Sequence, residues 1–469
     1  MKNKNGIKGG KMGKRLMLIL ACALIVGLAL PAFAEVQNVK VSGDITMYGV
    51  TRNNFTLGST IQEADDTGSE NASIVRVRLD ADLTENVGTT IRLVNERDWS
   101  MDAASVSEVS VDLASVTLKE FLYSPLTLTL GRQELHFGGD FIIGDPDRNN
   151  SSPATTFYNQ DLSSKKAFDA IRATLNYDPL VVDIFWAKIN ENTIIPAATA
   201  ATEEKDDIDL YGVNARYDFG GNWKTIGELY YFYKHDDSVR NTANLTNKKT
   251  TEVNVVGSRI DITPTARLNL QQEVALEFGR TNTTTTTNPL QPIKAWAAQT
   301  IARYDLTDKK LHPVLMGICG FYSGASSDVD QKNTNWDPMY ENQTSGHIAN
   351  VLLDPTNAHV LNLRGSIVPM EDLTVTLDYV YLRLAKGVVG STALTTYTPN
   401  HTTVTNITHT SDGLEYLGSE IDLTLTYDYT EDVQLGLIAG HFDGGDAFDN
   451  GSKDTKNASE LIASVKVSF

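Results

Sequence analysis

Cysteine is scarce in this chain of 469 residues, which has only Cys22 and Cys319. Two cysteines cannot supply a disulfide framework, and neither lies in a Cys-x-x-Cys motif or a Cys/His cluster. The eight histidines are scattered without the spacing of metal ligands. A fold organised around disulfides, zinc or haem is therefore excluded, and we expect no cofactor.

Positive charge is also in short supply. The chain has 40 Lys and Arg against 59 Asp and Glu, which gives a formal net charge of −19. A protein that binds duplex nucleic acid needs a basic surface, so this balance argues against that class. Hydrophobic residues make up 41% of the chain, too large a share for general disorder. We expect a folded protein that does not bind nucleic acid.

Long apolar runs are absent outside the amino terminus. There, a basic leader precedes the apolar run 16–30, which is short for a membrane span, and Ala32-Phe-Ala34 follows as an A-x-A cleavage site. We predict a signal peptide over residues 1–34, cleaved after Ala34, and a mature domain over residues 35–469. Lipid modification of Cys22 is a weaker alternative. No later run reaches about 20 residues, which excludes helical membrane spans.

The mature chain alternates between apolar and polar residues. In residues 73–83, Val75, Val77 and Leu79 fall on one face of a strand, and Arg76 and Arg78 fall on the other. The same period recurs at 166–178, 207–219, 266–280 and 415–429. These segments are longer than ordinary globular strands and match the reach of a tilted membrane strand. The pattern predicts an all-β membrane protein.

We count eighteen such segments, near residues 39–51, 72–84, 86–98, 105–119, 125–137, 166–178, 180–190, 207–219, 222–235, 250–263, 266–280, 293–305, 311–323, 358–369, 372–385, 415–429, 432–443 and 458–469. Every second connection is short, as at 85–86 and 220–221, whereas 138–165 and 324–357 are long. Short periplasmic turns that alternate with long external loops are typical of an outer-membrane β-barrel. We therefore predict a transmembrane antiparallel β-barrel in the outer membrane of a Gram-negative-type bacterium.

The charged faces of these strands predict the lining of a pore. Lipid cannot satisfy an open sheet edge, so the strands must close, and about eighteen strands enclose a lumen too wide for side chains to fill. A charge that faced lipid at mid-depth would cost about 2 to 4 kcal/mol for Arg or Lys. The inferred pore-lining residues are Arg76, Arg78, Arg92, Arg132, Arg172, Arg216, Arg259, Arg303, Arg364, Glu96, Glu228, Glu273, Glu420 and Asp422. Each arginine has a second interpretation, as the cross-strand partner of a carboxylate that stiffens the wall.

Arg132 does not fit the alternation. Strict alternation from Leu128 and Leu130 points Arg132 at lipid. We predict a bulge or change of phase at Gly131 that turns Arg132 into the lumen, because glycine suits such a shift.

Several short motifs also occur in a characteristic order. Leu128-Thr-Leu-Gly-Arg-Gln133 is followed by Phe168-Asp169 and Ile171-Arg172, then by Phe321-Tyr-Ser-Gly324, by Asn357-Ala-His359 through Arg364, and by Gly418-Ser-Glu-Ile-Asp-Leu423. Most of the mature chain thereby resembles the alginate export family of outer-membrane porins. The resemblance implies an eighteen-stranded barrel whose basic lumen residues select an anionic polyuronate, with Arg132, Arg172 and Arg364 in matching motifs. The acidic residues of the lumen faces would partly cancel the field that concentrates a polyanion.

Two features lie at the ends of the predicted strands. The chain ends in Phe469 after an alternating segment, which resembles the signal recognised by the barrel-assembly machinery; an ordinary final strand is the alternative. Aromatic residues near the short turns predict an interfacial girdle of Tyr177, Tyr217, Trp223, Tyr427, Tyr429 and Phe469.

Two loops are candidate sites. We expect the long loop 138–165 to constrict the lumen. Asp443, Asp446 and Asp449 could gather a hard cation such as calcium, although a solvated loop is the stronger interpretation.

Three functional hypotheses follow. The first is a passive channel for small or linear hydrophilic solutes, in particular anionic ones, embedded in outer-membrane lipid. The second is a barrel that sheathes a partner protein, as in a porin–cytochrome conduit. The third is a barrel hydrolase, the weakest because no catalytic constellation appears. We therefore predict that the protein is not an enzyme.

Overall fold

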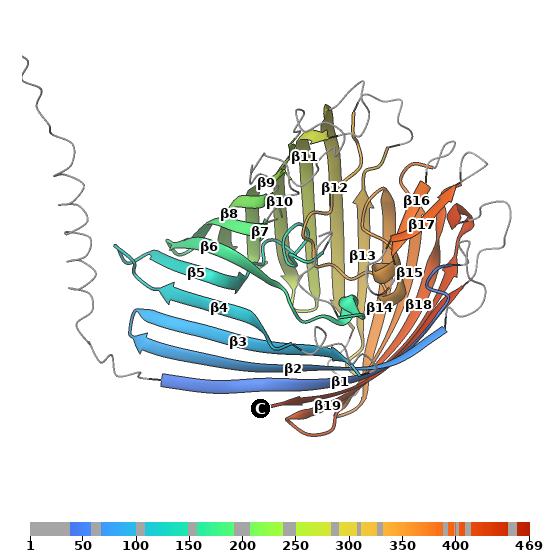
Figure 1. The fold of residues 1–469 in the computed structure, drawn as a ribbon, viewed down its shortest axis with the longest axis horizontal. Coiled ribbons are helices and arrows are strands. Elements are labelled where there is room, and N and C mark those ends of the chain that lie inside the picture. Colours follow the sequence, from blue (N-terminus) through green and yellow to red (C-terminus); the bar gives the residue numbers. More distant parts are fainter. Residues whose placement is uncertain are drawn as a thin grey trace, which may run out of the picture.

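The strands close into a barrel. The structure is a computed structural model that describes residues 38–57, 67–99, 108–148, 157–191, 207–237, 250–282, 290–306, 311–325, 332–387, 393–397, 399, 403–408, 414–448 and 457–469. Eighteen antiparallel strands form one sheet, and β1 pairs with β20, with Asp44 opposite Ser468, to join its two edges (Figure 1). The predicted eighteen-stranded antiparallel barrel is confirmed.

The barrel strands are β1 (Asn38–Asn53), β2 (Thr67–Thr84), β3 (Val87–Asp98), β4 (Ser110–Leu118), β5 (Leu126–Glu134), β6 (Ala167–Asn176), β7 (Leu180–Asn190), β8 (Ile208–Gly220), β9 (Thr225–Asp236), β10 (Thr251–Thr265), β11 (Leu268–Asn282), β12 (Leu290–Asp305), β13 (Val314–Tyr322), β14 (Ala358–Met370), β15 (Leu373–Leu384), β18 (Tyr416–Asp428), β19 (Val433–Gly444) and β20 (Ala458–Ser468). In the connection after β15, β16 (Ala393–Tyr397) and β17 (Thr403–Thr408) form a separate two-stranded sheet. The short helices are η2 (Gln160–Leu162), α2 (His347–Leu352) and η3 (Asp446–Phe448). Turns such as 85–86 and 371–372 are short, and they alternate with long connections as predicted.

The outer face of the barrel is apolar. On β2, Val77 and Leu79 are 42% and 37% exposed, and comparable exposed residues recur around the sheet, including Ile184, Leu276 and Leu423. A soluble protein rarely exposes an apolar surface of this extent, whereas a membrane barrel presents it to hydrocarbon. The alternation in the sequence therefore predicted the outward faces of these strands.

Aromatic residues are exposed at the short-turn end of the barrel. Tyr177, Tyr217, Trp223, Tyr429 and Phe469 are each between 39% and 64% exposed, and Tyr427 lies on the outer face of β18 beside Tyr429. Amphipathic rings at this level suit the boundary between hydrocarbon and water. The arrangement agrees with the predicted girdle.

Two connections fold into the barrel. We call residues 135–165 the first inward segment, described over 135–148 and 157–165, and residues 332–357 the second inward segment. They pair through their backbones: the Gly144 amide donates to the Tyr340 carbonyl at 2.7 Å, and the Tyr340 amide donates to the Ile142 carbonyl at 3.0 Å. The described residues of loop 138–165 thus lie inside the barrel, and the constriction of the lumen by this loop stays a prediction.

The hydrophobic core lies inside the barrel, between the inward segments and the wall. Phe137 of the first inward segment stacks on Phe185 of β7, with ring centroids 5.0 Å apart. Phe141 packs against Trp336 of the second inward segment and against Tyr322 of β13, at 6.0 and 5.7 Å. Burial of these rings favours the inward conformation of both segments by removing apolar area from water.

Among the described residues, no helix is both long enough and apolar enough to cross a membrane. Residues 1–34, including the predicted cleavage site after Ala34, lie outside the described residues.

Candidate functional site

The inner face of the barrel carries the predicted lumen residues. It holds Arg76, Arg78, Arg92, Arg172, Arg216, Arg259, Arg303, Arg364, Glu96, Glu228, Glu273, Glu420 and Asp422, all on the opposite strand face from the exposed apolar residues. Strand register brings several of them side by side. Across β8, β9, β10 and β11, the neighbours in register are Arg216, Glu228, Arg259 and Glu273, in that order. The period-two pattern thus placed these side chains on the correct face.

Arg132 is the exception, and its predicted inward orientation is wrong. Its register neighbours on the two adjoining strands are Ala114 and Asp169, on the face that also exposes Ile171, and neither pairing contains a register shift. Gly131 has a φ of 106°, but this local twist does not change the phase of the strand.

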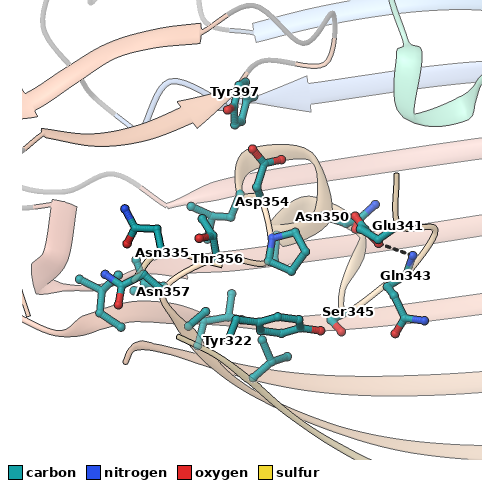
Figure 2. A pocket seen from close by; sticks show the side chains of 18 of the residues that line it. Tyr322, Asn335, Glu341, Gln343, Ser345, Asn350, Asp354, Thr356, Asn357 and Tyr397 are labelled. Carbon is teal, nitrogen blue, oxygen red and sulfur yellow. Dashed lines mark hydrogen bonds between the residues drawn. The ribbon is translucent and has the colours of Figure 1, made fainter. Parts of the chain in front are cut away.

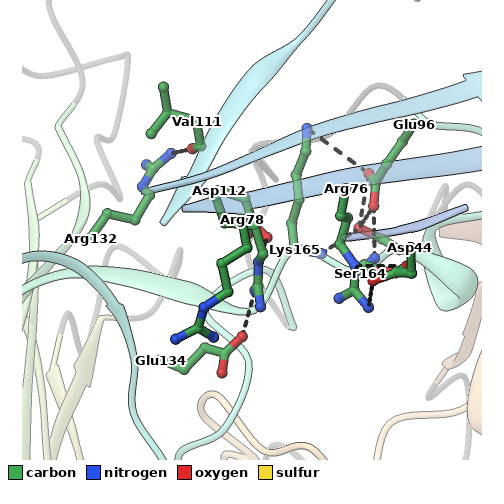
Figure 3. A network of polar contacts seen from close by, with 12 residues as sticks. Asp44, Arg76, Arg78, Glu96, Val111, Asp112, Arg132, Glu134, Ser164 and Lys165 are labelled. Atoms are coloured by element: carbon green, nitrogen blue, oxygen red, sulfur yellow. Dashed lines mark hydrogen bonds and ion pairs between the residues drawn. The ribbon is translucent and has the colours of Figure 1, made fainter. Parts of the chain in front are cut away.

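A neighbouring carboxylate makes the outward orientation tolerable. Arg132 binds Asp169 through two hydrogen bonds of 2.9 and 2.7 Å. It donates a third hydrogen bond, of 3.0 Å, to the Val111 carbonyl (Figure 3). Asp169 in turn lies opposite Lys188, and Lys188 lies opposite Asp209. A charge that faces lipid near the interface costs only about 0 to 1 kcal/mol. The outer face can therefore hold this row of paired charges close to the ends of the strands.

Most lumen arginines are paired with carboxylates. The guanidinium-to-carboxylate distances are 2.9 Å for Arg76–Asp44, 2.7 Å for Arg78–Asp80, 2.8 Å for Arg172–Asp183, 2.8 Å for Arg259–Glu228, 3.3 Å for Arg303–Asp305 and 2.6 Å for Arg364–Asp378, and Arg92 pairs with Asp112. Arg216 is exposed and has no hydrogen bond or ion pair within the described parts of the chain. The pairing supports the wall-stiffening interpretation of these arginines.

Carboxylates of the β9–β11 wall hold the two inward segments by their backbone. Glu228 and Glu273 accept hydrogen bonds from the Gly138 and Gly139 amides at 3.1 and 2.9 Å, and Glu277 accepts one from the Asp337 amide at 2.9 Å. Charged acceptors make strong hydrogen bonds where water is excluded. These carboxylates fix the inward segments against the wall.

A second wall position anchors α2. Glu420 accepts hydrogen bonds of 2.7 Å from the amides of Ile348 and Ala349, and Asp422 accepts one of 3.2 Å from the His347 amide. Both carboxylates have a relative exposure of 0%. Predicted as pore-lining, they are covered by the second inward segment, so a passing solute cannot touch them in this conformation.

The first inward segment is held on the opposite wall as well. Glu96 accepts hydrogen bonds from the Ser163 hydroxyl at 2.9 Å and from the Ser164 amide at 2.7 Å, beside Lys165 (Figure 3). Arg52 of β1 binds Asp161 at 2.5 Å. The first inward segment therefore contacts walls formed by strands far apart around the barrel.

Arg148 connects the two inward segments. Its guanidinium binds the Glu341 carboxylate at 2.8 Å and donates to the Asn350 and Leu353 carbonyls at 3.2 and 3.5 Å. Burial raises the pKa of Glu341, and the neighbouring Arg148 acts in the opposite direction. This buried pair sets the spacing between the segments.

A polar cleft of about 110 Å³ lies between the inward segments. Its charged lining residues include Lys165, Lys166, Arg148, Asp145, Asp161 and Glu341. Lys166 pairs with Asp145. The cleft is thus bordered by both signs of charge.

Sequence reasoning missed several residues of this site, including Arg52, Arg148, Lys165 and Glu341. Arg52 is in phase with Asp44 on β1, so strand periodicity could have revealed it. The others lie in connections, where no periodicity indicates which residue faces the lumen.

The suggested calcium site gains no support. Among the described residues, no group of three His, Cys, Asp or Glu side chains gathers to hold a metal. Asp443 is exposed at the end of β19, Asp446 accepts a hydrogen bond from the Tyr416 amide at 3.0 Å, and Asp449 lies outside the described residues.

Solved outer-membrane channels share this fold. Pseudomonas aeruginosa OccK2 (OpdF), solved in complex with glucuronate, is 12% identical, with a TM-score of 0.54 over 92% of this chain and 99% of that chain. Pseudomonas aeruginosa OccK11 (OpdR) is 12% identical, with a TM-score of 0.54 over 92% and 97%. Acinetobacter baumannii OccAB4 is 12% identical, with a TM-score of 0.51 over 93% and 100%.

Comparison of sequences gives a more specific relationship. No curated protein matches the chain. The model of a family described as alginate export matches residues 52–461, which is most of the chain. With the barrel, its apolar outer face and its charged lumen, this match identifies an outer-membrane channel of the porin type, and the chain belongs to the alginate export family.

Proposed function

We propose that the barrel is a passive channel for small or linear hydrophilic solutes that carry negative charge. The observation behind this proposal is the unequal exposure of paired charges in the lumen. The Arg364 side chain is 35% exposed and that of its partner Asp378 is 3%; Arg172 is 28% exposed and its partner Asp183 is 6%. A solute in the lumen therefore meets the guanidinium side of these pairs.

The covered carboxylates strengthen this asymmetry. Glu273, Glu420 and Asp422 are buried where they bind backbone amides of the inward segments, whereas Arg216 is exposed and unpaired within the described residues. The Arg92–Glu134 pair is an exception to this asymmetry, because its carboxylate is more exposed than its guanidinium. Exposed charge dominates the local field that a permeant ion senses.

The inward segments favour a channel over a sheath. Phe137, Phe141 and Trp336 pack inside the barrel, and Arg148 joins the two segments there. A partner protein threaded through the lumen would have to displace this core. Solutes smaller than a protein are therefore the better fit.

Reversal potentials test the proposal. The mature chain is reconstituted in planar bilayers under a potassium chloride gradient, with and without glucuronate oligomers. We expect a reversal potential that favours chloride and a conductance that uronate oligomers reduce. Arg172→Gln and Arg364→Gln should each shift the potential towards potassium. Arg383→Gln, an outer-face control beside Glu415, should not. Cation selectivity of the unaltered channel, or no conductance, would contradict the proposal.

We also propose that residues 1–34 direct export and are cleaved after Ala34, and that Phe469 helps the assembly machinery to recognise the barrel. Phe469 is 60% exposed at the chain end, where a receptor can reach it. Amino-terminal sequencing of the protein from outer membranes should begin at Glu35. Removal of Phe469 should lower the amount of assembled barrel, while unchanged assembly would exclude that role.

A further inference from the structure

A second cavity lies beside the polar cleft and shares Glu341, Gln343 and Asn350 with it. It measures about 320 Å³ and separates the second inward segment from the inner face of β13–β15 and β18 (Figure 2). Small-molecule pockets span about 300 to 1,000 Å³, so this one is large enough for a small ligand. Tyr322 and Tyr397 lie on opposite sides of it in Figure 2, with Ser345 beside the Tyr322 ring.

The charges of this cavity do not suit an anion. Its lining includes the Glu341 and Asp354 carboxylates, and its cation, Lys386, is solvent-exposed. Arg148 pairs with both carboxylates, at 2.8 Å from Glu341 and 3.9 Å from Asp354, but it is not among the residues that line the cavity. An anionic solute would face like charge here, in contrast to the track of exposed arginines.

The polar groups of the cavity are mainly amides and hydroxyls. Asn335, Gln343, Asn350 and Asn357 line it together with Ser345 and Thr356. Within the described residues, the Asn350 side-chain amide and the Ser345 hydroxyl have no hydrogen-bond partner, although both border the cavity. Amide and hydroxyl groups can each donate and accept, as the hydroxyls of a ligand require.

The rest of the lining is apolar. Leu382, Leu384 and Leu417 of the barrel wall form one side with Val360 and the ring of Tyr322, all of them buried. A surface of this kind packs against the C–H face of a ring, while the amides opposite it bind the hydroxyl edge.

We propose that this cavity binds an uncharged, polyhydroxylated solute of the size of a small sugar. Its lining combines an apolar floor, unpartnered amide and hydroxyl groups, and two carboxylates that disfavour anions. The site lies between the second inward segment and the barrel wall. Its occupancy does not depend on the ion selectivity of the channel.

Calorimetric titration of the purified full-length mature protein in detergent tests the inference, with glucose, maltose and glucuronate as probes. We expect saturable binding of glucose or maltose, and glucuronate binding weaker by about ten-fold or more because it must desolvate a carboxylate beside Glu341 and Asp354. No binding of either neutral sugar, or tighter binding of glucuronate, would overturn the proposal.

Two adjacent positions supply a matched pair of variants. Ser345 lines this cavity and Thr344 lines the polar cleft on the other side of the segment. Ser345→Phe should fill the cavity and abolish sugar binding, and Thr344→Phe, which adds a similar ring, should leave binding within about two-fold of the original. Equal binding by both variants would overturn the assignment of the site.

A second, smaller substitution tests the site even if the Ser345→Phe variant does not fold. Asn350→Leu removes the unpartnered amide at similar volume and leaves the Asn350 carbonyl to Arg148. We expect sugar affinity to fall about ten-fold while the conductance in bilayers persists. Unchanged affinity would refute the proposal, and the persistence of conductance separates this result from any failure of the channel function.

Discussion

The backbones of Gly43 and Phe469 exchange two hydrogen bonds. The Gly43 amide donates to the Phe469 carbonyl at 2.8 Å, and the Phe469 amide donates to the Gly43 carbonyl at 2.9 Å. They extend the pairing of β1 with β20 at the seam of the barrel. The last residue of the chain thereby takes part in closure, and a side chain at Gly43 has no room: a Cβ there would lie 2.5 Å from the Arg76 carbonyl and 2.7 Å from the Phe469 ring.

Gly43→Val should weaken barrel closure. The added carbons meet backbone that cannot move away, so we expect a loss of about 1 to 3 kcal/mol. Heat-modifiable mobility in denaturing gels should show unfolding at a lower temperature. Gly68→Val is the control, because a Cβ at Gly68 meets nothing within 4 Å. Equal behaviour of the two variants would show that the seam tolerates bulk.

His136 should titrate above its ordinary pKa of about 6.5. Its ring nitrogen lies 3.1 Å from the Asp140 carboxylate, whose hydrogen bond raises the pKa of His136, partly opposed by burial. Because the folded pKa is raised, the stabilisation is complete below the unfolded pKa and is lost as pH rises through the folded pKa.

Histidine-selective NMR titration in micelles should therefore give a folded pKa above 6.5 for His136. Asp140→Asn keeps the shape and tolerates the positive φ of 58° at that position, and should return the pKa towards its ordinary value. No change in this variant would exclude Asp140 as the cause.

Loss of Arg148 should loosen the inward segments. Arg148→Met leaves Glu341 buried without its 2.8 Å partner, and breaking a buried pair in this way costs about 3 to 5 kcal/mol. We expect local release of the segments, seen as higher single-channel conductance and more current noise. Arg303→Met is the control, since the Arg303–Asp305 pair is largely exposed and contacts neither inward segment within the described parts of the chain. If the Arg148→Met channel had the same conductance as the unaltered channel, the contact between the inward segments would not limit the current.

Asp378→Asn should increase anion selectivity. Arg364 binds the buried Asp378 at 2.6 Å, so removal of this negative charge leaves the more exposed guanidinium uncompensated. The reversal potential under a salt gradient should shift towards chloride, opposite to the shift expected for Arg364→Gln. If the reversal potential shifted in the same direction in both variants, the Arg364–Asp378 pair would not set the local electrostatic field.

Asp169→Ala should destabilise the barrel by exposing the Arg132 charge on the outer face. Near the interface an unpaired arginine costs about 0 to 1 kcal/mol, and towards the middle of the bilayer the cost rises to about 2 to 4 kcal/mol. The free energy of unfolding, measured with urea in lipid vesicles, should show which of these two costs applies to Arg132. The double variant, Asp169→Ala with Arg132→Ala, should recover most of the lost free energy of unfolding. A double variant no more stable than Asp169→Ala would show that the Arg132 charge does not cause the destabilisation.

Strand periodicity explains which parts of the site could be predicted. Arg76 and Val77 point to opposite faces because successive residues of a strand alternate, and only one face can carry charge when the other meets hydrocarbon. Arg132 follows the alternation and faces outward, so the error lay in the assumption that every charge must face the lumen. Its partner Asp169 lies on the same outward face, and a paired charge near the interface needs no change of phase. Alternation alone cannot detect such a partner.

The number of strands, their inner and outer faces and the closure of the barrel follow from the amino-acid sequence, because they depend on a local period and on a solvent that forbids open edges. Three features became visible in the folded chain alone: Glu420 binds the amides of α2, Arg148 reaches Glu341, and a cavity of about 320 Å³ remains behind the second inward segment. These contacts join residues far apart in the chain, and their geometry depends on how irregular segments pack inside a barrel of fixed size.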